Sequence, residues 1–217
     1  MPRTSRWFAG LLATAAVAVF GVAAPAQAAT VSQPLRTLIA NLPVATEIRT
    51  GYDRDLFPHW IDTDSDSCNT RYEVLIAEAT TRPSVGSGCA LSGGRWYSYY
   101  DAAYWTNPSD LDIDHMVALA EAWDSGARSW TTSRRQAYAN DLGDARSLVA
   151  VTDNVNQSKG DQDPTTWVPT QERCRYVGEW AAVKTRWRLT VDTAEKSALT
   201  SYAASCSNIT ITVTHAF

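Results

Sequence analysis

The chain has 217 residues, of which 45% are hydrophobic, and it carries 19 Lys and Arg residues against 23 Asp and Glu residues. A chain of this length and composition can bury a substantial core, which excludes a disordered or low-complexity protein. The acidic balance excludes a protein that holds nucleic acid through net positive charge alone, so a polyanionic partner would need local cations.

The first 28 residues have the pattern of a secretory signal peptide. Arg3 and Arg6 precede the apolar run FAGLLATAAVAVFGVAA, which ends in the small-residue sequence AQA. This order predicts export and cleavage before Ala29, and the Ala- and Gly-rich composition disfavours the alternative of a permanent membrane anchor. Residues 29–217 are then expected to form a single domain, with 17 basic and 23 acidic residues and a net charge of −6.

Four cysteines in an exported chain predict two disulfides. Three pairings are possible. The two nearest-neighbour loops are favoured because each would link one end of the domain: Cys68 with Cys89, and Cys174 with Cys206. A structural zinc site is the rival interpretation, but the chain has no C-x-x-C pair to support it.

Two short helices and a strand are predicted in the first half of the chain. The helices cover residues 32–42 and 70–79, and the second begins with Thr70 and Glu73 at capping-box spacing. The aromatic run RWYSYYD predicts a strand. The loop before the second helix carries three alternate aspartates, Asp62, Asp64 and Asp66. Their spacing suggests a calcium loop, but the EF-hand glycine is missing, so a turn-rich surface loop is favoured.

The middle of the chain predicts two strands separated by helices and followed by a short helix. LDIDHMV alternates apolar and polar residues, and SLVAVT is a second apolar strand. Residues 120–127 and 133–141 look helical. DNVNQSKG then predicts a helix with Asp153 as its cap and Gly160 as its end. If the two strands pair and the helix folds back across them, their polar residues converge.

The last third predicts two antiparallel helices, from QERCRYVGEWAAVKTRWRL and DTAEKSALTSYAASC, and an edge strand from NITITV. The second helix begins with Asp192 and Glu195 at capping spacing. The first is rich in basic residues, which predict either a nucleic-acid surface or a solvated helix face. These residues are Arg173, Arg175, Lys184, Arg186 and Arg188.

Four polar residues of the central segments could meet in one place if the hairpin and helix form as predicted. His115 can accept a proton near neutral pH. Carboxylate and amide oxygens, as in Asp114 and Asn156, can hold a hard cation. Lys159 lies three residues after Asn156 and therefore on the same helix face. Successive strand residues point to opposite faces, so we expect irregular backbone at Asp114 and His115 that lets both enter one pocket.

This order of segments resembles the HNH, or ββα-metal, nuclease motif. LDIDHMV, LVAV and N-x-x-K-G-D are similar to the HNH domain of CRISPR effector nucleases. The runs DIDHMVALAEAW, RRQAYANDL, LVAV and NQSKGDQDPTTWVP resemble more closely the secreted bacterial HNH endonuclease-like proteins related to the C-terminal nuclease domain of GmrSD-type restriction enzymes. The resemblance covers most of the mature chain, including GYDRDLFPHW and TRYEVL. It implies an α+β fold, with an HNH-type core hairpin and helix surrounded by additional helices.

The resemblance also implies roles for individual residues. His115 would be the general base, Asp114 and Asn156 would bind one divalent metal, and Lys159 would lie near the phosphates. Magnesium is the expected metal, with Mn²⁺, Zn²⁺ and Ca²⁺ as alternatives. The residue that orients His115 stays open between two candidates, Asn140 and Ser147.

The expected function is that of a secreted, extracellular endonuclease that acts on nucleic acid, with DNA favoured and little sequence preference. We expect a monomer without stable membrane association, with Arg134 and Arg135 as further candidates for substrate contacts. His59 lies among aromatic residues and is expected to be packed or hydrogen-bonded. Two other classes stay open: a carbohydrate hydrolase, which would need two acids across a cleft, and a non-catalytic secreted binding module.

Overall fold

The computed structural model describes Met1 and residues 28–217, so nearly all of the predicted signal peptide lies outside the described residues. The described chain combines helices with four small antiparallel sheets, each of two strands, and contains two disulfides. The expected α+β class with two disulfides is therefore confirmed. None of the described helices is long and apolar enough to cross a membrane.

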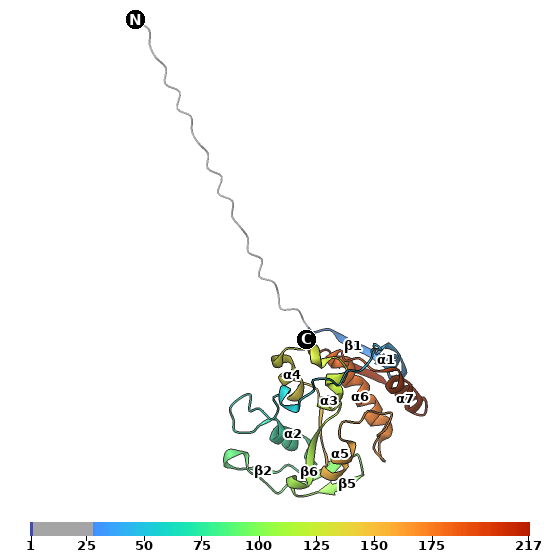
Figure 1. Cartoon of the computed structure of the whole chain (residues 1–217). Coiled ribbons are helices and arrows are strands. Elements are labelled where there is room, and N and C mark those ends of the chain that lie inside the picture. Colours follow the sequence, from blue (N-terminus) through green and yellow to red (C-terminus); the bar gives the residue numbers. More distant parts are fainter. Residues whose placement is uncertain (2–27) are drawn as a thin grey trace.

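The strands pair as β1 with β8, β2 with β3, β4 with β5 and β6 with β7 (Figure 1). Their bounds are β1 Thr30–Pro34, β2 Ser84–Val85, β3 Leu91–Ser92, β4 Trp96–Ser98, β5 Ala103–Trp105, β6 Leu111–His115, β7 Leu148–Thr152 and β8 Thr210–Thr214. The α-helices are α1 Leu35–Asn41, α2 Thr70–Glu78, α3 Leu119–Asp124, α4 Thr132–Ala139, α5 Asp153–Lys159, α6 Arg173–Trp187 and α7 Thr193–Ala204.

Most predicted elements are present, with differences at their ends. The helix predicted over 32–42 begins only at Leu35, because the preceding residues form β1 and pair with β8. The cap predicted at Thr70 is wrong: the side chain of Asn69 accepts the hydrogen bond from Tyr72 N and caps α2. The cap at Asp192 is confirmed by its bond from Glu195 N.

The central hairpin of β6 and β7 is regular along its whole length. Asp114 pairs with Val149 and His115 pairs with Leu148, without a bulge. The expectation of irregular backbone at this point is therefore wrong. Because side chains alternate between the two faces of a regular strand, Asp114 and His115 point to opposite faces of the hairpin.

The hairpin lies between two hydrophobic clusters. All five residues of β7 are buried, and their side chains alternate between the clusters. Val149 and Val151 join the larger cluster, which includes Trp180 of α6. Leu148 and Ala150 join the smaller cluster, which also contains Leu75 of α2 and Trp96 of β4. Each fully buried Val or Leu side chain contributes about 1.5–3 kcal/mol, so this two-sided burial stabilises the hairpin.

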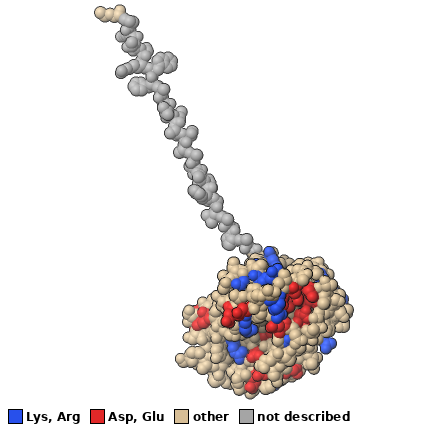
Figure 2. Space-filling model, in the orientation of Figure 1, with Lys and Arg blue, Asp and Glu red and all other residues tan. Residues whose placement is uncertain are grey.

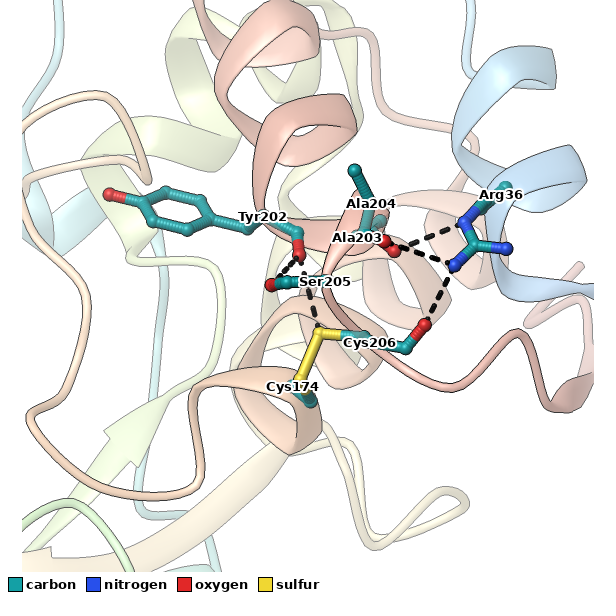
Figure 3. The surroundings of a disulfide bond; sticks show 7 residues. All are labelled: Arg36, Cys174, Tyr202, Ala203, Ala204, Ser205 and Cys206. Atoms are coloured by element: carbon teal, nitrogen blue, oxygen red, sulfur yellow. Dashed lines mark hydrogen bonds between the residues drawn. A yellow bond between two sulfur atoms is a disulfide. The ribbon is translucent and has the colours of Figure 1, made fainter.

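The two disulfides have the nearest-neighbour pairing. Cys68 bonds to Cys89, and Cys174 of α6 bonds to Cys206, just after α7. Figure 3 shows that Arg36 of α1 donates hydrogen bonds to the carbonyls of Ala203, Ala204 and Cys206 beside the second disulfide. This end of the protein is therefore held by one covalent bond and one guanidinium that together link three helices.

Candidate functional site

One face of the central hairpin presents carboxylates to α5. Asp112 and Asp114 lie two residues apart on β6 and so share this face. The Asn156 Nδ2 atom donates to Asp112 Oδ2 at 3.3 Å, and Lys159 Nζ donates to both carboxylate oxygens of Asp114 at 2.7 Å. Three of the four expected residues, Asp114, Asn156 and Lys159, are thus on one side of the hairpin, together with Asp112.

Asp114 is held in a buried ion pair. Its side chain is 6% exposed and that of Lys159 is 0% exposed. The Tyr100 hydroxyl donates to Asp114 Oδ2 at 2.5 Å, and Lys159 Nζ also donates to the His115 carbonyl at 3.0 Å. Burial raises the pKa of the Asp114 carboxyl, while Lys159 and Tyr100 act in the opposite direction. Both oxygens of this carboxylate are therefore occupied within the protein.

Asp112 is more accessible, because it is only partly buried. Among the described residues, its carboxylate accepts a side-chain hydrogen bond only from the Asn156 amide. Turning over that amide would present its oxygen beside the carboxylate, which gives an oxygen pair suited to a hard cation. A Mg²⁺ ion is commonly held by one or two carboxylates together with waters and substrate phosphates. The donor atoms on this face of the hairpin therefore fit a divalent metal.

Other acidic clusters lie away from the hairpin in the described chain. Asp62, Asp64 and Asp66 converge on the surface, and Asp66 also lies close to Glu73 and to the buried, disulfide-bonded Cys68. The carboxylates of this loop accept backbone hydrogen bonds from Ser65, Ser67 and Cys68, as expected for a turn-rich loop. Two further groups share Glu47: one with Glu121 and Glu195, the other with Asp163 and Asp192.

His115 occupies the opposite face of the hairpin. Its Nε2 atom lies 2.9 Å from the Ala139 carbonyl oxygen. A carbonyl can only accept, so Nε2 carries the hydrogen and Nδ1 has the lone pair in the neutral ring. Burial lowers the pKa of His115 to about 3, although the bond to Ala139 opposes that shift. The ring is therefore neutral at pH 7 and has one nitrogen able to accept a proton.

Neither predicted orienting side chain contacts His115. Asn140 instead donates to the carbonyl of Pro58 at 2.8 Å and accepts from Ile61 N at 3.1 Å. Ser147 donates its hydroxyl to Asp141 at 2.7 Å. The backbone carbonyl of Ala139 performs the orienting role that we expected of a side chain. A backbone carbonyl has no sequence signature, so no motif indicated this contact.

Residues 66–202, well over half of the chain, match the family model of the C-terminal domain of GmrSD restriction endonucleases. The chain belongs to this family. Membership in the GmrSD C-terminal domain family indicates a nuclease-type function. The matched region includes the hairpin, α5 and the contacts of His115 with Ala139.

A fungal relative extends the comparison. A protein of Arthroderma benhamiae, described as an uncharacterized secreted protein, is 51% identical over 174 residues, which are 79% of this chain and 84% of the relative. The likeness is thus not restricted to bacterial proteins. Secretion of the relative and the two disulfides both fit an extracellular location. No solved structure matches the chain.

The segment GYDRDLFPHW lies before the part that matches the GmrSD C-terminal domain, yet it packs on the candidate base. The Trp60 ring lies 5.5 Å from the His115 ring, centroid to centroid, and the His59 ring lies 5.4 Å from Trp60. The side chain of Arg54 is exposed, and its positive charge is among the causes that lower the pKa of His115. No signal in the sequence indicated that this segment would contact His115.

The basic residues proposed for substrate contacts are used largely within the protein. Arg135 is 8% exposed and donates to the carbonyls of Leu56 and Trp130. Arg134 lies over the Phe217 ring and donates to the Trp187 carbonyl. Lys184 and Arg186 of α6 are also buried, paired with acidic residues, so this helix does not present them as a free cationic face. Figure 2 shows basic and acidic side chains close together on the visible face.

Proposed function

We propose that residues 29–217 form one domain that acts as a secreted, metal-dependent HNH endonuclease, with DNA as its substrate and little sequence preference. Family membership supports the nuclease class. The observation that carries the proposal is the hairpin with α5 across it, in which Asn156 faces a carboxylate of β6 and His115 is the last residue of the same strand. The His115 ring lies on the opposite face, so the proposal requires a substrate phosphate that reaches both faces around the end of β6. In this proposal, β6, β7 and α5 are the ββα-metal core.

The proposed base is His115. Its Nδ1 atom would take a proton from the attacking water, and the Ala139 carbonyl would stabilise the resulting imidazolium through Nε2. The low pKa of His115 in the free protein keeps the ring neutral, but it also makes the ring a weak base until substrate binds. A bound phosphate would raise that pKa, because a nearby negative charge favours the protonated ring.

A divalent ion such as Mg²⁺, when bound, would neutralise charge on the phosphate and on the leaving oxygen. Asn156 would hold it with a carboxylate of β6. Asp112 already contacts Asn156, while Asp114, the ligand implied by the resemblance, must first give up or share Lys159. The proposed role of Lys159 is therefore to neutralise Asp114 when no ion is bound.

Plasmid nicking tests the proposal. The wild-type protein should nick plasmid DNA with Mg²⁺ and lose this activity with a chelator. His115→Gln retains an amide donor for the Ala139 carbonyl but has no basic nitrogen, and we expect its rate to fall by about 10²-fold or more. His215→Asn is the matched control and should cleave normally. Equal cleavage by wild type and His115→Gln at equal melting temperature would remove His115 from the mechanism.

One observation favours a second candidate, a non-catalytic secreted binding module. Asp114 is fully partnered by Lys159 and Tyr100, as a purely structural carboxylate would be. In that case no divalent ion should raise the melting temperature and the wild-type protein should leave plasmid intact. A metal-dependent rise in melting temperature favours the nuclease instead.

A further inference from the structure

A second histidine, His59, is held close to the candidate base. Its Nδ1 atom lies 2.8 Å from the Phe57 carbonyl oxygen, so Nδ1 donates and Nε2 is left without a partner among the described residues. The side chain is partly exposed. His115 has the mirror arrangement, with Nε2 on a carbonyl and Nδ1 free. Each imidazole thus has one nitrogen fixed by the backbone and one available for chemistry.

Trp60 fixes the relation between the two histidines. Its indole makes an edge contact with the His59 ring, at 5.4 Å between centroids, and a tilted contact with the His115 ring, at 5.5 Å. The side chains of His59 and His115 are therefore neighbours across a single indole, although 56 positions separate them in the chain.

The backbone at Trp60 is strained in order to make these contacts. Trp60 has φ +57°, in the left-handed region that bulky residues avoid. Such strain costs about 1–3 kcal/mol and persists only where the surroundings enforce it. Asn140 does so, since its amide bonds to Pro58 O on one side of Trp60 and to Ile61 N on the other. Asn140 is the residue that follows Ala139, whose carbonyl holds His115.

His59 and His115 are linked by packing, because the Trp60 ring contacts both imidazoles. A phosphate within reach of His115 Nδ1 would therefore lie on the same side of the hairpin as His59. Hydrolysis of a phosphodiester needs a base for the water and, in addition, a proton for the sugar oxygen that leaves.

We propose that His59 is a second catalytic residue, which in its imidazolium form, with both ring nitrogens protonated, donates the Nε2 proton to the leaving sugar oxygen. This inference rests on the proposed nuclease function. In the reaction the water oxygen forms a bond to phosphorus and gives its proton to His115 Nδ1. The bond from phosphorus to the leaving oxygen breaks, and that oxygen takes the proton from His59 Nε2. Solvent then returns a proton to His59 and removes one from His115.

A leaving group that needs no proton tests this role. The substrate is a DNA duplex in which sulfur replaces the leaving oxygen at one bond, since a thiolate departs without protonation. His59→Asn keeps an amide donor for the Phe57 carbonyl and so preserves the turn. We expect this variant to cut the normal bond about 10²-fold more slowly than wild type. It should cut the sulfur-containing bond at close to the wild-type rate.

Two further variants separate this role from others. His115→Gln should lose cleavage of both bonds, because the water must be activated in either case, and His215→Asn should keep both. The inference is overturned if His59→Asn cuts the normal bond at the wild-type rate, or if it slows both bonds equally, as a loss of positioning would. A wild-type protein that cuts neither bond refutes the proposed nuclease function itself, and with it the role of His59.

Discussion

At the scale of single residues, the candidate site depends on which polar groups the protein already uses. His115 and Asn156 were expected to converge from the Asp-His and N-x-x-K patterns, but the His115 ring lies on the opposite face of the hairpin from Asn156. Lys159 was expected near phosphates, but its ammonium group is buried against Asp114. Sequence spacing predicts which residues share a face of a helix or strand. The burial and the hydrogen-bond partners of those residues depend on side chains from distant segments, such as Tyr100.

Lys159→Met should destabilise the protein in the absence of metal. It leaves the Asp114 charge buried without its cation, which costs about 3–5 kcal/mol in the free energy of unfolding. Urea denaturation measures this loss. Added Mn²⁺ should raise the melting temperature of this variant more than that of wild type, because the ion can take the place of the ammonium group.

The double variant Asp114→Asn with Lys159→Met is the matched control, since it removes both charges. Its stability should recover part of the loss, and Mn²⁺ should have little additional effect. A single variant Lys159→Met as stable as wild type would show that the ion pair does not hold this part of the site.

At the scale of elements, local patterns predicted the hairpin and α5, while long-range pairing decided their details. LDIDHMV and SLVAVT form β6 and β7, and DNVNQSKG forms α5, which ends before Gly160 as predicted. The cap predicted at Asp153 is wrong, because Asp153 is the first residue of the helix and Thr152 precedes it without a side-chain cap. The expectation of an irregular backbone at His115 was wrong because β6 stays paired with β7 up to its last residue, with His115 opposite Leu148. Strand β1 was missed because its partner, β8, lies about 180 residues away.

The outer edge of β7 carries a titratable group. Glu78 of α2 accepts a hydrogen bond from Ala150 N at 2.7 Å. Burial raises the pKa of Glu78 to about 7, although the bond from Ala150 opposes this shift. A raised pKa in the folded state means that this carboxyl contributes most stability below about pH 4.5, and that the contribution is lost as the pH rises through about 7.

Glu78→Gln should therefore flatten the pH dependence of stability. The amide keeps an oxygen for Ala150 N and never ionises. Relative to wild type, the variant should gain up to about 3 kcal/mol in unfolding free energy at pH 8 and little at pH 4. Denaturant titrations at the two pH values measure the difference. An equal difference in unfolding free energy between Glu78→Gln and wild type at pH 4 and pH 8 would show that Glu78 does not ionise with a raised pKa.

At the scale of the whole molecule, the two disulfides add stability that the small two-stranded sheets do not provide. Each sheet has only two strands in the described chain, and isolated pairs of strands are weak. The two disulfides close loops with sequence separations of 21 and 32 residues. The pairing was predicted because an even number of cysteines in an exported chain restricts the choices, and the nearest-neighbour arrangement is confirmed.

Removing the disulfide between Cys174 and Cys206 should destabilise the fold without abolishing it. Replacing both Cys174 and Cys206 by Ser should lower the free energy of unfolding by about 3–4 kcal/mol, as expected for a loop of this length. Denaturant unfolding under non-reducing conditions gives the value. The corresponding replacement of Cys68 and Cys89 provides the comparison, with a similar or slightly smaller loss. An unchanged midpoint in both variants would show that the links add nothing to stability.

The pairing of β1 with β8 also constrains when the protein can fold. Residues near both ends of the described body are hydrogen-bonded, with His215 N donating to Ala29 O, and β1 lies at the same end of the molecule as the C-terminus (Figure 1). A ribosome produces β1 about 180 residues before β8, so this sheet cannot close until the chain between them has been made. The delay leaves the emerging polypeptide open, which is the state that a translocation channel requires.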